Sequence, residues 1–63
     1  MVLKFTTKRD ASGNRYTLKI DPDTKTYARN YKDSWTYSDH ITITKKDREK
    51  LIQQLDAAGY TQI

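Results

Sequence analysis

The sequence predicts a small α+β domain in which a short antiparallel sheet packs on a single C-terminal helix, in the order β-β-β-(β)-α. Three observations lead to this fold. Apolar and polar residues alternate along several segments, turn-forming residues separate these segments, and the last third of the chain has the periodicity of one amphipathic helix. A chain of 63 residues has room for one such domain, residues 1–63.

The alternation predicts strands at residues 2–8, 15–20, 25–31 and 40–43. Turn residues separate the first three strands. Gly13 and Asn14, which tolerate positive φ, precede the second strand, and Asp21 and Pro22 begin the turn before the third. We therefore expect two consecutive hairpins, followed by a polar stretch with embedded aromatic residues and a short fourth strand.

The helix is predicted at residues 45–58, and capping residues mark both of its ends. Thr44, with Asp47 three residues later, resembles a capping box in which a shorter acid replaces the usual Glu or Gln. Gly59 suits the C′ position, and Tyr60 can fold back on the helix.

The predicted core lies between the sheet and the helix. The sheet contributes Leu3, Phe5, Tyr16, Leu18, Ile20, Ile41 and Ile43, and the helix contributes Leu51, Ile52, Leu55 and Ala58. A core this small leaves a thin margin over chain entropy, so we expect Trp35 and Tyr60 to add to its rim.

Positive charge is concentrated in the N-terminal half. Residues 1–32 carry eight basic and three acidic side chains, a net charge of +5, whereas residues 33–63 carry −1. An anionic partner should therefore prefer the N-terminal half.

The leading functional hypothesis is a non-enzymatic module whose basic sheet face contacts DNA or RNA. If Thr26 and Ala28 lie under the helix, the other residues of the third strand face outward with the lysines of the first two strands. Cations on such a face neutralise phosphates, and flat rings stack on bases. The predicted site comprises Lys4, Lys8, Arg15, Lys19, Lys25, Tyr27, Arg29 and Tyr31.

The third strand also admits the opposite parity. A slip of one residue turns every side chain to the other face, which would put Tyr27 and Tyr31 in the core and leave Arg29 reaching to solvent. The sequence does not decide between the two.

The alternative function is a protein-interaction or inhibitory module. It would use the segment from Trp35 to Tyr37, or an exposed sheet edge, to dock on another protein or to form a homodimer. Short basic domains of this size are typical of phages and mobile elements, which is compatible with either hypothesis.

Several classes of function find no motif here. The chain has no Cys, and His40, its only His, lies in no recognised ligand spacing, so we expect no metal, no cofactor and no enzymatic activity. No apolar run approaches the ~20 residues of a membrane span. We expect no membrane partner, and a cytoplasmic location is compatible with the absence of Cys.

Three strands followed by a helix, with a basic sheet, resemble the arm-site DNA-binding domains of tyrosine recombinases. The resemblance implies a sheet that reads the major groove of DNA. The aromatic segment from Trp35 to Ile43 departs from that pattern.

Overall fold

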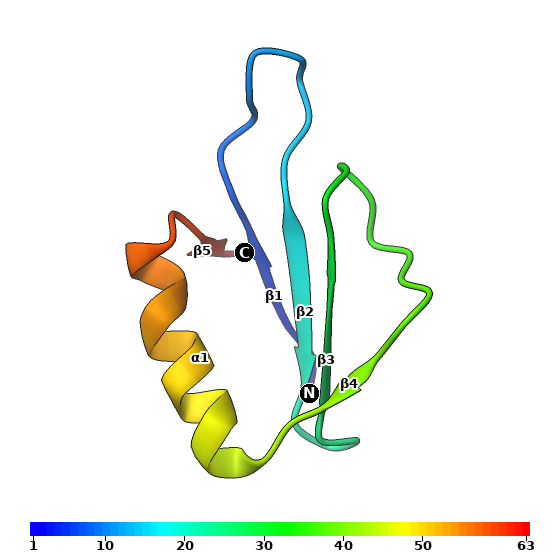
Figure 1. The fold of residues 1–63 in the computed structure, drawn as a ribbon, viewed down its shortest axis with the longest axis vertical. Coiled ribbons are helices and arrows are strands. Elements are labelled where there is room, and N and C mark those ends of the chain that lie inside the picture. Colours follow the sequence, from blue (N-terminus) through cyan, green and yellow to red (C-terminus); the bar gives the residue numbers. More distant parts are fainter.

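The computed structural model describes residues 1–63 and contains a five-stranded antiparallel sheet with one helix beside it (Figure 1). The elements are β1 (Leu3–Thr6), β2 (Thr17–Asp21), β3 (Thr26–Asn30), β4 (Ile41–Thr42), α1 (Lys45–Ala57) and β5 (Thr61–Gln62). The strand order across the sheet is β4-β3-β2-β1-β5. The predicted α+β fold is confirmed, and the four predicted strands and the helix lie within two residues of their predicted ends.

The fifth strand was not predicted from the sequence. The helix ends in the expected turn, in which Gly59 has a φ of 89° and the Tyr60 N–H donates to the Leu55 carbonyl over 2.8 Å. This turn sends Thr61 and Gln62 back along β1. A strand of two residues is too short to show alternation, so only its pairing with β1 defines it.

Local carboxylates order the two hairpin turns. The Asp21 carboxylate accepts hydrogen bonds from the N–H groups of Asp23 and Thr24, as expected for an Asp that opens a turn. In the β1–β2 loop, the Asp10 carboxylate accepts from the N–H groups of Ser12 and Asn14. Both turns are therefore fixed by contacts within a few residues, without help from the core.

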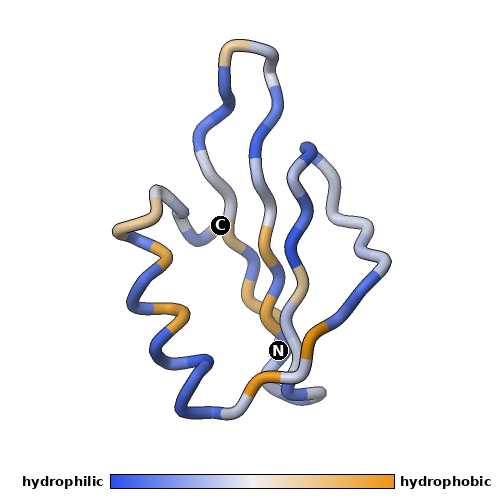
Figure 2. Tube along the Cα trace, in the orientation of Figure 1, coloured by the Kyte–Doolittle hydropathy of each residue, from blue (hydrophilic) through white to orange (hydrophobic).

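The hydrophobic core lies between the sheet and α1. Its buried cluster is Phe5, Leu18, Ile20 and Leu55, and Leu3, Tyr27, Leu51, Ile52 and Tyr60 pack against it. Figure 2 shows hydrophobic positions of the helix on its side toward the strands. The core is small, because only eight of the 63 residues are buried. No helix in the structure has the length and hydropathy needed to cross a membrane.

Three residues assigned to the core from the sequence are exposed instead. Tyr16 is 46% exposed, because it precedes β2, where the hairpin extends past the helix (Figure 1). Ile41 is 49% exposed in the two-residue edge strand β4. Ala58 is the C-cap residue and is also exposed. Alternation and helical periodicity predict a face, but not how far the covering layer extends.

The register of β3 decides the open question of its parity. Ile20 pairs with Tyr27 and Leu18 pairs with Arg29, and paired residues of an antiparallel ladder point to the same face. Tyr27 and Arg29 therefore lie on the face that carries the core, and Ala28 lies on the opposite face. The prediction that Tyr27 and Arg29 share an outward face with the lysines of β1 and β2 is wrong.

Candidate interaction site at the edge of β3

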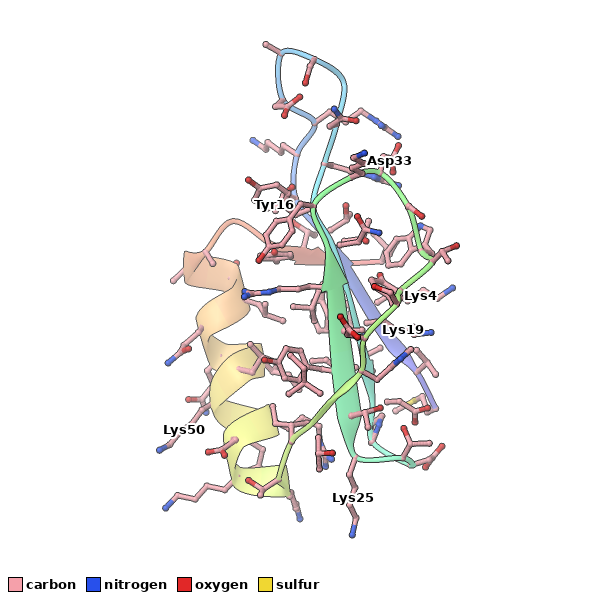
Figure 3. The ribbon with its side chains drawn as sticks, turned by 45° about the vertical axis from the view of Figure 1, so that its right-hand side comes forward. Lys4, Tyr16, Lys19, Lys25, Asp33 and Lys50 are labelled. Atoms are coloured by element: carbon pink, nitrogen blue, oxygen red, sulfur yellow. The ribbon has the colours of Figure 1, made fainter.

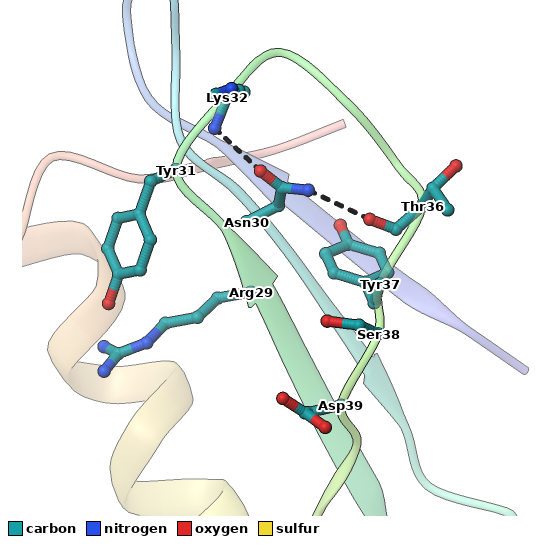
Figure 4. Close-up of a pocket in the computed structure, with 8 residues that line it drawn as sticks. All are labelled: Arg29, Asn30, Tyr31, Lys32, Thr36, Tyr37, Ser38 and Asp39. Atoms are coloured by element: carbon teal, nitrogen blue, oxygen red, sulfur yellow. Dashed lines mark hydrogen bonds between the residues drawn. The ribbon is translucent and has the colours of Figure 1, made fainter.

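The structure divides the residues of the predicted nucleic-acid face between two sides of the sheet. Lys4 and Lys19 are register partners on β1 and β2, and both project from the side away from the helix (Figure 3). Arg29 and Tyr31 project toward the helix side (Figure 4). Tyr27 is half-buried against the core on that same side.

The other predicted residues lie beyond the strands. Lys8 is exposed in the β1–β2 loop, and Lys25 extends from one end of the sheet (Figure 3). Arg15 forms an ion pair with Asp33 over 2.8 Å, so its charge is compensated within the protein. The eight residues therefore do not form a single surface.

The segment between β3 and β4 covers part of the sheet on the side away from the helix. The Lys4 ammonium lies 5.5 Å from the centre of the Trp35 ring, and the Lys19 ammonium lies 5.3 Å from that of Tyr37. The Tyr37 hydroxyl donates to the Thr17 hydroxyl over 3.0 Å, and partial burial raises the pKa of Tyr37. Trp35 and Tyr37 are half-buried rather than displayed on a free loop.

The edge of β3 has a free stretch, because β4 is shorter than β3. β4 pairs only with Thr26 and Tyr27, and the Ile43 N–H donates to the Lys25 carbonyl over 2.9 Å. From Ala28 onward, β3 has no strand on that side (Figure 1).

The hydrogen-bonding phase of the ladder shows which groups this free edge presents. Successive residues of a strand in an antiparallel sheet point their backbone groups alternately to the two neighbouring strands. The Lys25 carbonyl bonds toward β4, so both backbone groups of Arg29 point the same way. The Tyr31 N–H does too, because it shares a peptide unit with the carbonyl of Asn30, the last residue of β3, which points toward β2. The Thr7 N–H donates to the Tyr16 carbonyl, so the backbone groups of Tyr16 and of Leu18, two residues later, point toward β1. Leu18 is the register partner of Arg29 and therefore does not bond to it. The backbone groups of Arg29 and the Tyr31 N–H therefore do not bond to β2. No turn or loop backbone hydrogen bond involves either residue.

A pocket of about 530 Å³ lies against this edge (Figure 4). It is lined by Arg29, Asn30, Tyr31, Lys32, Thr36, Tyr37, Ser38 and Asp39. The Asn30 side-chain amide donates to the Thr36 carbonyl over 2.9 Å, and the Asn30 side-chain oxygen accepts from the Lys32 N–H over 2.8 Å. The Asn30 side chain thus links β3 to the far wall of the pocket and fixes the segment at a distance from the strand.

The pocket was not identified from the sequence, although one signal for it was present. The third strand was predicted at seven residues and the fourth at four, and a short partner leaves part of a longer strand unpaired. Tyr31 and Tyr37, which belong to different functional hypotheses, line this one pocket.

No cluster of three or more His, Cys, Asp or Glu side chains forms a group that could hold a metal ion. His40 is exposed next to β4. Comparisons with protein-family models, curated proteins and solved structures find no match to this chain. The resemblance to arm-site DNA-binding domains therefore rests on strand order and charge alone.

Proposed function

We propose that this protein is a non-enzymatic binding module that captures an extended peptide segment of another protein by adding it as a strand to the free edge of β3. The observation that carries the proposal is a set of outward-pointing backbone groups, both of Arg29 and the N–H of Tyr31, beside a pocket. Addition of a strand to an exposed sheet edge is a recurring mode of peptide recognition, because main-chain hydrogen bonds supply affinity without requiring one sequence.

The edge offers a short ladder. Arg29 presents its N–H and its carbonyl, Tyr31 presents its N–H, and two residues along a strand span about 6.6 Å, which matches alternate residues of an incoming strand. Each hydrogen bond contributes roughly 0.5–1.5 kcal/mol net, so a peptide held by this edge alone binds weakly and exchanges quickly. We place this activity in the cytoplasm, since the chain has no Cys.

The proposal is tested with a neutral strand-forming peptide, acetyl-Thr-Val-Thr-Val-Thr-amide, and two variants at one position. Arg29→Pro removes an N–H that the ladder does not use, so the protein should stay folded and lose binding. Arg29→Gln keeps the N–H and should still bind. Amide chemical shifts in two-dimensional NMR report both folding and binding, and the amides of Arg29 and Tyr31 should become protected from hydrogen exchange in the wild-type complex.

Equal binding by the proline and glutamine variants would show that the backbone edge is not the docking site. Peptide-induced shifts confined to the helix, with Arg29 and Tyr31 unchanged, would lead to the same conclusion.

The second candidate function is nucleic-acid binding, and a specific observation supports it. Ten of the twelve Lys and Arg side chains form no ion pair, because only Arg9 and Arg15 contact an acid. Two of these free cations, Lys4 and Lys19, lie over the aromatic rings of Trp35 and Tyr37 on one side of the sheet. In this case, the side of the sheet that carries Lys4, Lys19 and the aromatic segment would contact a single strand of DNA or RNA.

A further inference from the structure

We propose that the segment captured at the β3 edge is acidic, with a carboxylate opposite Arg29 and an aromatic side chain opposite Tyr31. This inference rests on the proposed function and specifies its ligand. In an antiparallel pair, it describes a peptide that reads aromatic, any residue, acid, from its N-terminus to its C-terminus.

The positive charge at the edge is uncompensated. Arg29 forms no ion pair; its guanidinium lies 5.5 Å from the centre of the Tyr31 ring. Lys32 is a second cation without an ion pair on the pocket wall. Asp39 is the one acidic residue that lines the pocket, so the lining carries two positive charges and one negative charge. A carboxylate brought to the position opposite Arg29 would meet a guanidinium already aligned by an aromatic ring.

The register of β4 indicates what fits the free positions. β4 pairs Ile41 with Tyr27 and Thr42 with Thr26. The same register, continued along β3, sets Asp39 opposite Arg29 and, one residue past the end of β3, Tyr37 opposite Tyr31. The chain thus encodes an opposite-charge pair and an aromatic pair for this edge, both of which are favourable across strands.

The chain does not occupy this edge itself, because Tyr37 is held elsewhere. Its hydroxyl bonds to Thr17 and its ring faces the Lys19 ammonium, on the side of the sheet opposite to Tyr31. Thr36, next to Tyr37, is bonded to the side chain of Asn30 and not to the backbone edge of β3. A separate segment with the same pattern can therefore occupy the positions opposite Arg29 and Tyr31, which the chain's own residues do not fill.

Charge disfavours a second copy of this chain as the occupant. Pairing two β3 edges would bring together the Arg29 and Lys32 side chains of both copies, and each copy carries a net charge of +4. An acidic segment reverses the sign of that interaction.

The test uses the capped pentapeptide Thr-Tyr-Ser-Asp-His, which has the sequence of residues 36–40, on the full chain. We expect it to bind more tightly than the neutral Thr/Val peptide. Changing its Asp to Asn should weaken binding about two- to fivefold, the range of a cross-strand charge pair, and N-methylation of that Asp should abolish binding. The protein variant Arg29→Gln should remove the preference for Asp over Asn. The control Lys50→Gln, which removes one positive charge from a lysine pointing away from the sheet (Figure 3), should preserve it.

Each outcome separates the two proposals. Equal binding of the Asp and Asn peptides, with loss on N-methylation, would overturn the acidic ligand and leave strand addition standing. If no peptide binds, both proposals fail. If the Arg29→Gln variant still prefers the Asp peptide over the Asn peptide, the carboxylate of the ligand does not interact with Arg29. Sedimentation of the free protein as a dimer, with protection of the Arg29 amide, would assign the edge to a second copy.

Discussion

Asp33 joins the β1–β2 loop to the start of the segment that follows β3. Its carboxylate pairs with the guanidinium groups of Arg9 and Arg15, and these two hydrogen-bonded arginines lower its pKa below 3.8. A carboxyl whose pKa is lowered by folding stabilises the native state above its unfolded pKa, and this contribution disappears as the pH falls through the folded value.

We expect Asp33→Asn to lower the melting temperature at pH 7, because two arginines lose their partner. The difference from wild type should shrink as the pH falls below about 3.8, since protonation then removes the same charge from Asp33. Circular dichroism melts at several pH values provide the measurement.

Asp39→Asn is the matched control for this test, because Asp39 is an exposed carboxylate without an ion pair. It should show no comparable difference at pH 7. If the Asp33→Asn difference stayed constant from pH 7 to pH 2, the charge of Asp33 would not be the cause.

The helix is attached to the sheet chiefly through Leu55. Leu55 is the one residue of α1 that is buried, with 4% exposure, whereas Leu51 and Ile52 are half-buried. The C-terminal turn supports the same attachment, because Gly59 leads the chain into β5, which pairs with β1. At the other end, the Asp47 N–H donates to the N-cap hydroxyl of Thr44, which stabilises the first turn of the helix itself.

We expect Leu55→Ala to cost about 2–5 kcal/mol of unfolding free energy, because it removes a buried side chain and leaves a cavity. In so small a core, this loss should leave much of the protein unfolded at 25 °C. Leu51→Ala is the control and should cost less, since Leu51 is already partly exposed to solvent. Urea titration measures both variants, and an equal cost would contradict the central place of Leu55.

The helix and the turn between β2 and β3 could be predicted because their determinants are local. Thr44 and Gly59 mark the helix ends by chemistry within a few residues, and Asp21 does the same for a turn. Tyr27 could not be placed, because its face depends on the register with β2, and both parities of β3 alternate equally well. The pocket depends on where β4 stops pairing and on the anchoring of Tyr37 by Thr17, two long-range facts that no sequence pattern expresses.

At the scale of the whole molecule, the uncompensated positive charge has no single focus. Lys4 and Lys19 lie on one side of the sheet, Lys25 at its end and Lys50 on the outer side of the helix (Figure 3). A polyanion is attracted by all of them, but only cations that contact phosphates contribute to the salt dependence of binding. Salt titration therefore distinguishes a nucleic-acid site from a generally basic surface.

If the second candidate function is correct, binding of single-stranded DNA should weaken with salt by about 0.7 log unit per log unit of salt for each phosphate contacted. Lys4→Gln and Lys19→Gln should each reduce that slope by about one contact, whereas Lys50→Gln should leave it unchanged. Trp35→Ala should weaken binding by about 1–3 kcal/mol if its ring stacks on a base. Fluorescence anisotropy of a labelled oligonucleotide measures all four variants. An equal reduction of the slope by Lys50→Gln would show that the attraction is spread over the surface, and no binding at low salt would leave the β3 edge as the remaining candidate site.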